Sequence, residues 1–208
     1  MKKLLQIIAT PRGEDSRTLK VSAAFIEEFK KRHPDWDVEE LDLFKKDLAP
    51  LTVKRVDGKY ILLGGKDLPA EYEKAWQGII AEIERFSSAD VYLISTPMWN
   101  FSIPYVLKHY IDLIIQPKYL FRYTDKGPEG LLKNKKMVVI TSRGGDYSGS
   151  EASKFDFQEP YLRAIFGLVG ITDITFINAQ PMDAFGVEVQ KKKIEEAKII
   201  ARRIAGGI

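Results

Sequence analysis

Four short apolar runs alternate along the chain with longer segments in which apolar residues recur at helical spacing. The runs are LLQIIAT (4–10), VYLIST (91–96), MVVITS (137–142) and ITFINA (174–179). A fifth run, VEELDL (38–43), is half polar, which is typical of a strand at the edge of a sheet rather than at its centre. Strands that alternate with helices indicate βαβ units, so the pattern predicts a parallel sheet.

Five helices are predicted between and after these runs, because their apolar residues repeat at i, i+3, i+4 and i+7. The predicted stripes are Leu19, Ala23, Ile26 and Phe29; Tyr72, Ala75, Trp76, Ile79, Ile80 and Ile83; Ile103, Val106, Leu107, Tyr110, Ile111 and Ile114; Tyr161, Leu162, Ile165, Phe166 and Val169; and Ile194, Ala197, Ala201 and Ile204.

Five strands and five helices suit an α/β fold with an open, doubly wound parallel sheet and helices on both faces. With the polar second strand at an edge and right-handed crossovers, the expected strand order is 2-1-3-4-5, the flavodoxin-like topology. No seam divides residues 1–208, so a single domain is expected. Residues 44–68 and 116–134 are not absorbed by this core, and such long loops often form lids or binding segments.

The composition narrows the class of function. Hydrophobic residues make up 45% of the 208 positions and the net charge is only +3, so we expect a globular protein without a nucleic-acid footprint. The absence of cysteine excludes a disulfide framework, a thiolate metal site and a cysteine nucleophile. The apolar start is too short for a signal peptide and no run could span a bilayer, so a cytoplasmic protein with no membrane association is expected.

In an open α/β sheet, ligands bind beyond the carboxyl ends of the strands where the strand order reverses. The loop after the first strand runs from Thr10 through Ser16 and Arg17 to Thr18 at the start of a helix. Hydroxyls and N–H groups at a helix N-terminus can bind a phosphate. Alternatively, Ser16 only caps the helix. Neither a Walker lysine nor G-x-G-x-x-G is present, which disfavours nucleoside triphosphate hydrolysis and Rossmann-type dinucleotide binding.

The loops after the third and fourth strands could bind a flat ring. The first contains Met98, Trp99, Asn100 and Phe101; its aromatic residues could flank a ring, or could instead fill the helix–sheet junction. The second is Ser142-Arg143-Gly144-Gly145, in which paired glycines would let backbone N–H groups approach a ligand closely. Together the three loops predict a site for a phosphorylated planar cofactor.

Several ordered motifs carry a resemblance to a known family. A resemblance to the azoreductase family of FMN-dependent NADH:quinone oxidoreductases is carried by the segments Pro97–Phe101, Phe121–Thr124, Gly127–Leu131, Thr141–Gly145, Pro160–Leu162, Phe166–Gly167 and Gly170–Asp173. The resemblance covers nearly the whole chain, but it is poor over Phe44–Lys66, which leaves substrate preference open. It implies FMN-phosphate positions at Thr10, Ser16, Arg17 and Thr18. It implies ring positions at Met98, Trp99, Asn100, Phe101, Ser142, Arg143, Gly144 and Gly145.

The resemblance implies that the chain takes hydride from NADH or NADPH and passes two electrons to quinones or azo compounds by a ping-pong mechanism. The flavin would perform the chemistry, so no protein acid or base is required. Backbone amides near Asn100, Phe101, Gly144 and Gly145 would stabilise charge on its reduced form. Two alternatives remain, a flavodoxin-like electron carrier and a flavin-binding regulator without turnover. The histidines, His33 and His109, belong to no catalytic constellation, and no nucleophile elbow G-x-S-x-G is present.

Residues 116–131 carry Tyr119, Phe121 and Tyr123 at alternate positions. Alternation places such residues on one side of an extended strand, and TDKGPEG is a plausible turn. This aromatic face packs back on its own domain, folds over the ligand site or meets another chain. Because the family is homodimeric, the resemblance implies a two-fold homodimer in which Phe121 helps form the substrate pocket.

Overall fold

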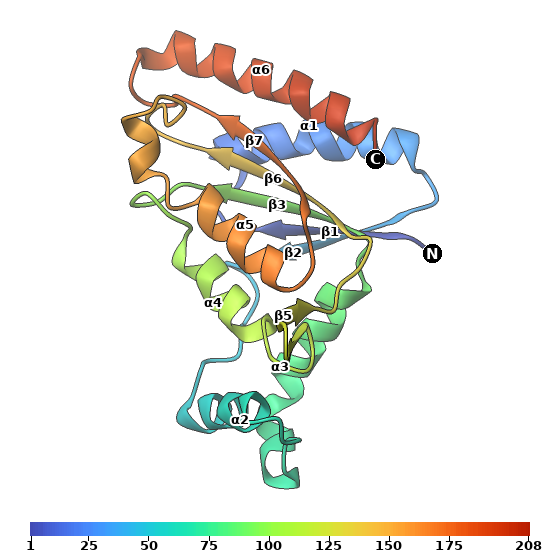
Figure 1. Cartoon of the computed structure of the whole chain (residues 1–208). Helices are drawn as coiled ribbons and strands as arrows, with labels where there is room; N and C mark the ends of the chain where they lie inside the picture. The colour runs from blue at the N-terminus through green and yellow to red at the C-terminus, as the bar shows by residue number, and fades with distance from the viewer.

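A five-stranded parallel sheet forms the centre of the molecule, in a computed structural model that describes residues 1–208 (Figure 1). Its strands are β1 (Lys3–Ile8), β2 (Asp37–Asp42), β3 (Val91–Pro97), β6 (Lys136–Ser142) and β7 (Asp173–Ala179). They lie in the order β2-β1-β3-β6-β7, and every neighbouring pair is parallel. In terms of the sheet strands this is the predicted order 2-1-3-4-5.

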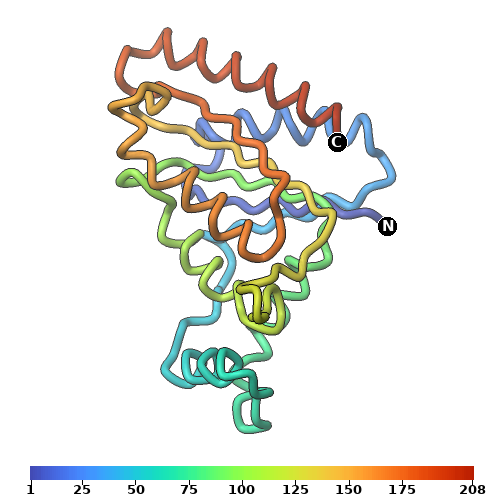
Figure 2. Tube along the Cα trace, viewed as in Figure 1, coloured from blue at the N-terminus to red at the C-terminus, as the bar shows by residue number.

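Helices cover both faces of the sheet, as predicted. On one face α1 (Arg17–Arg32) and α6 (Gly186–Ala205) run side by side (Figure 2), and on the other lie α3 (Ala70–Ser88), α4 (Tyr105–Ile114) and α5 (Glu159–Leu168). Alternate residues of each strand point to opposite faces: Leu4 packs in the core under α1 and α6, whereas Leu5 packs in the larger core on the other side. The sheet therefore separates two hydrophobic cores.

The stripe predicted for α1 is only partly buried. Phe29 is fully buried, but Leu19 and Ile26 are half-buried and Ala23 is exposed. Val21, Ala24 and Phe25 are buried in their place. The helix carries two adjacent apolar stripes, and the sheet and α6 cover only one of them.

The segment 44–68, expected to be a loop, contains a sixth helix, α2 (Val53–Leu63). Its mixed sequence, VKRVDGKYILL, carries no strong amphipathic period. α2 projects from the body of the molecule in Figure 1 and packs on α3. Gly58 makes this contact so closely that a Cβ atom there would overlap the indole of Trp76.

The segment 116–134 forms an antiparallel hairpin of β4 (Phe121–Thr124) and β5 (Gly127–Gly130). The predicted common aromatic face is only partly present. Phe121 is 4% exposed and belongs to the larger core, whereas Tyr123 is exposed and meets the edge of the Phe121 ring. Tyr119 precedes the strand and stacks on Trp76. The aromatic face thus packs largely on its own domain.

No helix in the structure has both the length and the apolar character needed to cross a membrane.

Candidate functional site

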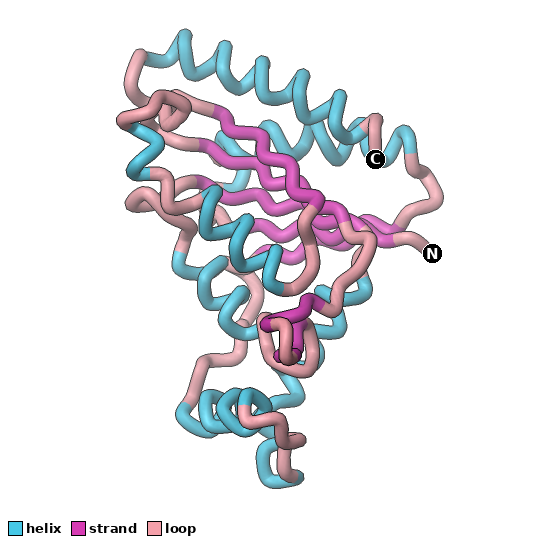
Figure 3. Tube along the Cα trace, in the orientation of Figure 1, coloured by secondary structure: helices cyan, strands magenta, loops and turns pink.

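The three loops singled out in the sequence meet at the carboxyl ends of β1, β3 and β6, along one edge of the sheet (Figure 3). Between them lies a cavity of about 190 Å³. The predicted residues that line it are Thr10, Ser16, Arg17, Met98, Trp99, Ser142, Arg143 and Gly144, and the others are Arg12, Pro97 and Asp183. The fold therefore brings together predicted residues that are up to 134 positions apart in the sequence, from Thr10 to Gly144.

The N-terminus of α1 supplies unpartnered amides to this cavity. Ser16 is the N-cap, and its Oγ accepts a hydrogen bond from the Leu19 N–H at 3.3 Å. The N–H of Lys20 donates to the Ser16 carbonyl at 3.1 Å. The amides of Arg17 and Thr18 make no hydrogen bond within the chain, which is the arrangement that binds anions at helix N-termini. Ser16 therefore caps the helix, and the cap leaves the neighbouring amides available.

Charged side chains surround the same point. Arg17 Nη1 lies 2.7 Å from Asp183 Oδ1, and Arg12 is exposed beside them. Asp183 lies beyond β7, and its N–H donates to the Gly144 carbonyl at 3.0 Å. Nothing in the sequence marked Asp183 as a site residue, because it belongs to no motif and reaches the cavity only through tertiary contacts.

The loop after β3 contains a strained turn. The N–H and C=O groups of Trp99 and Ser102 are joined by two reciprocal hydrogen bonds of 2.9 Å, and the residues between them, Asn100 and Phe101, have φ of 47° and 67°. Two positive φ values define a type I′ turn, which normally takes Asn-Gly. A side chain larger than that of glycine or asparagine costs about 1–2 kcal/mol in this conformation, yet Phe101 is retained and is 46% exposed. The amides of Asn100 and Phe101 have no partner in the chain.

The glycine pair after β6 also presents unpartnered amides. Neither Gly144 nor Gly145 donates its N–H within the chain, and neither has a positive φ. A Cβ at Gly144 would come within 3.1 Å of Asp183 Oδ2, whereas a Cβ at Gly145 would meet only the Tyr147 ring at 3.6 Å, an ordinary contact. The fold itself therefore leaves room for a side chain at Gly145.

Arg143 lines the cavity, but its guanidinium is buried and bonded to other side chains of the protein. It is 2% exposed, and it donates to Gln158 Oε1 at 3.1 Å and to Asp156 Oδ2 at 2.8 Å. Gln158 in turn donates to the Pro97 carbonyl at 2.9 Å. The backbone of Arg143 is also occupied, since its N–H bonds to Ala179. Arg143 thus ties together the segments that carry the site, while Thr18 and Ser142 are linked by hydroxyls 2.7 Å apart.

A second hollow of about 480 Å³ lies on the other side of the type I′ turn. Trp99 lines both hollows, and Tyr161 of α5 forms part of the second. Burial, with a smaller contribution from Asp112, raises the pKa of Tyr161 to about 12, so its phenol stays protonated near neutral pH and can donate a hydrogen bond. Phe121 lines neither hollow.

These groups fit a phosphorylated planar cofactor. The helix terminus and Arg17 offer amides and a positive charge for one phosphate. The type I′ turn and the glycine pair offer four amides for the polar edge of a ring, and Trp99 and Phe101 offer apolar surface.

Comparisons with known proteins agree with this arrangement. A family model described as "Flavodoxin-like fold" matches residues 2–204. Among curated relatives, an FMN-dependent NADH:quinone oxidoreductase of Nitratidesulfovibrio vulgaris is 39% identical over 206 residues, 99% of each chain. An FMN-dependent NADH:quinone oxidoreductase 2 of Clostridium perfringens is 43% identical over 197 residues, 94% of each chain.

Solved structures give the same relationship. The azoreductase of Bacillus anthracis str. Sterne superposes with a TM-score of 0.90 at 30% identity, over 100% of both chains. An FMN-dependent NADH-azoreductase of Bacillus anthracis str. Ames Ancestor in complex with FMN superposes with a TM-score of 0.85 at 30% identity, over 99% of this chain and 100% of that one. From the fold, the site and these relatives together, the chain belongs to the flavodoxin-like family of FMN-dependent NADH:quinone oxidoreductases and azoreductases.

Proposed function

We propose that this chain is an enzyme that binds FMN non-covalently and transfers two electrons from NADH or NADPH to quinones and azo compounds. The observation that carries the proposal is the set of unpartnered backbone amides on the three loops around one cavity, which is lined by Arg17 and Gly144 among the residues that carry them. Relatives at about 40% identity over nearly the whole chain, named FMN-dependent NADH:quinone oxidoreductases, support it.

The phosphate of FMN would be held at the start of α1. The amides of Arg17 and Thr18 point from the helix N-terminus, where partial positive charge attracts an anion. The guanidinium of Arg17 adds a full charge, and the hydroxyls of Thr10 and Ser16 can donate to phosphate oxygens. Only one such terminus lines the cavity, which favours FMN over a dinucleotide such as FAD.

The ring of FMN would lie against the turn and the glycine pair. Bound FMN supplies the hydride and electron transfer that the side chains here cannot perform. The amides of Asn100, Phe101, Gly144 and Gly145 would donate to its polar edge and stabilise the negative charge that reduction places there. Met98, Trp99 and Phe101 provide apolar contact, and Ser142 and Arg143 hold these segments in place.

Cofactor binding can be tested apart from turnover. When FMN is added to the apoprotein, we expect the protein to become yellow and the fluorescence of the flavin to be quenched. Denaturation of the loaded protein should then release FMN and no FAD. Ser16→Ala should weaken the binding of FMN by about 0.5–2 kcal/mol, the usual contribution of a capping hydroxyl or a hydrogen bond. Gly145→Val should abolish binding without unfolding the apoprotein, because the chain leaves room for a Cβ there. Recovery of FAD, or no bound flavin after reconstitution, contradicts the proposal.

Turnover separates the enzyme from the alternatives. An electron carrier or a non-catalytic regulator would bind FMN but would not sustain NADH oxidation with a quinone. We propose that donor and acceptor use one surface in turn, which predicts parallel double-reciprocal lines. Intersecting lines with a captured ternary complex would refute the ping-pong order and leave FMN binding intact.

We also propose a two-fold homodimer. Exposed aromatic side chains support it, because Phe101, Phe155 and Phe157 gather beside the site and Tyr123 protrudes from the hairpin, and such surface is often an interface. The participation of Phe121 in a substrate pocket stays a prediction. Its ring is 4% exposed in this chain, so the contact would require the hairpin to move. A mass near 23.7 kDa in solution, with full activity, would refute the dimer.

A further inference from the structure

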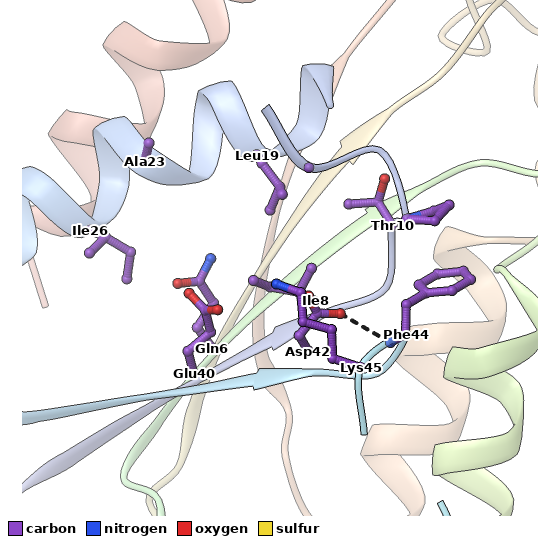
Figure 4. A pocket seen from close by; sticks show the side chains of 12 residues that line it. Gln6, Ile8, Thr10, Leu19, Ala23, Ile26, Glu40, Asp42, Phe44 and Lys45 are labelled. Atoms are coloured by element: carbon purple, nitrogen blue, oxygen red, sulfur yellow. Dashed lines mark hydrogen bonds and ion pairs between the residues drawn. The ribbon is translucent and has the colours of Figure 1, made fainter. Parts of the chain in front are cut away.

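A groove of about 650 Å³ runs between α1 and the sheet, beneath the apolar stripe that the core does not cover (Figure 4). Leu19, Ala23 and Ile26 form its helical wall. They occupy positions i, i+4 and i+7, so they lie in line along one side of α1. Its volume is within the range of small-molecule sites, roughly 300–1,000 Å³.

The floor of the groove is polar and comes from two adjacent strands. Gln6 of β1 pairs in register with Glu40 of β2, and Ile8 pairs with Asp42. Residues two apart on a strand share a face, so Gln6, Ile8, Glu40 and Asp42 all point toward α1. In Figure 4 the Gln6 amide and the Glu40 carboxylate lie side by side below Ala23 and Ile26.

Gln6 is the one polar residue between the apolar residues of β1, and its head group lacks full hydrogen bonding. The residue is 7% exposed. Its amide nitrogen is 3.5 Å from Ser95 Oγ, at the limit of a hydrogen bond, and its amide oxygen has no partner within the chain. The oxygen is not among the fully buried unpartnered atoms of the chain, so it is an acceptor open to a donor that enters the groove.

The groove also carries one uncompensated negative charge. Asp42 accepts a hydrogen bond from the Phe44 N–H at 3.0 Å and pairs with Lys45 at 3.0 Å. Glu40 makes no ion pair, and the cations that pair with the preceding Glu39, Lys3 and Arg85, lie on the opposite side of the sheet. A free carboxylate and an amide oxygen therefore face an aliphatic wall.

From this arrangement we infer a second ligand site, specific for an organic cation with an apolar body. An ammonium group would donate to the Glu40 carboxylate and the Gln6 oxygen. The body would cover the exposed sides of Leu19, Ala23 and Ile26, where burial of apolar surface favours binding. Of the residues that line the cofactor cavity, the groove shares only Thr10, so the inference does not rest on the proposed function.

The test uses three ligands that carry a phenyl ring on a four-carbon chain and differ in charge: 4-phenylbutylamine, 4-phenylbutan-1-ol and 4-phenylbutyrate. Each is titrated into FMN-loaded protein carrying labelled isoleucine and leucine methyl groups. We expect the amine to shift the methyl signals of Ile8, Leu19 and Ile26 saturably, and to leave Ile199 on the exposed side of α6 unchanged. The alcohol should bind more weakly at the same methyls, and the butyrate weakest.

Substitutions then test whether the Glu40 carboxylate recognises the ammonium group. Glu40→Gln should lower the affinity for the amine about fivefold, as expected for the loss of one exposed ion pair of about 1 kcal/mol. The affinity for the alcohol should stay unchanged. Glu14→Gln, the matched control, removes an exposed carboxylate outside the groove and should leave both affinities unchanged. Ala23→Leu should fill the groove and abolish binding of both, with the fold retained because Ala23 is exposed.

Three results would overturn the inference. One is the absence of any shift of the groove methyls at millimolar amine. Another is equal affinity for amine and alcohol. The last is equal weakening of the amine by Glu14→Gln and Glu40→Gln, which would assign the effect to the overall charge of the protein.

Discussion

Replacing Phe101 by glycine and, separately, by alanine distinguishes backbone strain in the 99–102 turn from the contribution of the ring. Both variants lose the same contacts, since the ring is 46% exposed and meets Phe155 and Tyr147 at centroid distances of 5.5 and 6.3 Å. That loss should be about 1–2 kcal/mol in each variant. Only the glycine variant also relieves the positive φ of 67°.

The sign of the difference between the two variants is the test. At a positive φ, alanine should be less stable than glycine by about 1 kcal/mol. At an ordinary φ the order reverses, because glycine gains more entropy on unfolding, by about 0.4–1 kcal/mol. Ser102, the next residue, has no positive φ and supplies the control: Ser102→Gly should be less stable than Ser102→Ala.

Urea denaturation of the apoprotein measures these differences directly, provided that all variants share the same slope. A Phe101→Gly variant no more stable than Phe101→Ala, at equal slope, would refute the strained turn. If the strain is real, the protein retains a phenylalanine where glycine would be more stable, which is the pattern expected of a side chain kept for a ligand.

Three further predictions concern charges around the site. Arg143→Met should destabilise the apoprotein by about 3 kcal/mol, because the nearly buried carboxylate of Asp156 loses its partner; urea denaturation measures this, and Asp156→Asn in the same chain should recover part of the loss. Asp183→Asn should increase the affinity for FMN about fivefold, since it removes a carboxylate whose oxygen lies 2.7 Å from Arg17 Nη1. An unchanged or lower affinity, measured from the quenching of flavin fluorescence, would contradict this. Burial raises the pKa of Tyr161 from 10.0 to about 12. The contribution of the protonated phenol to stability is therefore complete below pH 10 and is lost as the pH rises toward 12. The difference in unfolding free energy between the unmodified protein and Tyr161→Phe should change over that window and stay constant below it.

The sequence predicts the sheet well because each central strand is an apolar run buried on both faces. The half-polar run at 38–43 became β2 at the edge, where one side lies open. Periodicity located the helices that pack on the sheet for the same reason. α2 was missed because it packs on another helix through Gly58, and such a contact leaves little apolar period.

The loops of the site were located from the topology, but the orientations of their side chains were not. Arg143 stands within a glycine-rich loop and appears available in the sequence, yet Asp156 and Gln158, more than ten positions later, turn it inward. Asp183 reaches the cavity only because the chain turns back after β7. Similarly, the stripe of Leu19, Ala23 and Ile26 was correctly identified as apolar but faces a groove, since helical spacing does not say which of two adjacent stripes meets the core.

The peripheral position of α2 implies a hierarchy of opening motions. Its main contact with the body is with α3, and Leu62 is its one residue in a hydrophobic core, so it can detach at the loss of only a small part of the larger core. Its amides should then exchange with deuterium much faster than those of β3, and brief proteolysis should cut first between residues 44 and 69. Gly58→Ala should speed both processes by pushing the helix off Trp76, without moving the urea midpoint of the sheet.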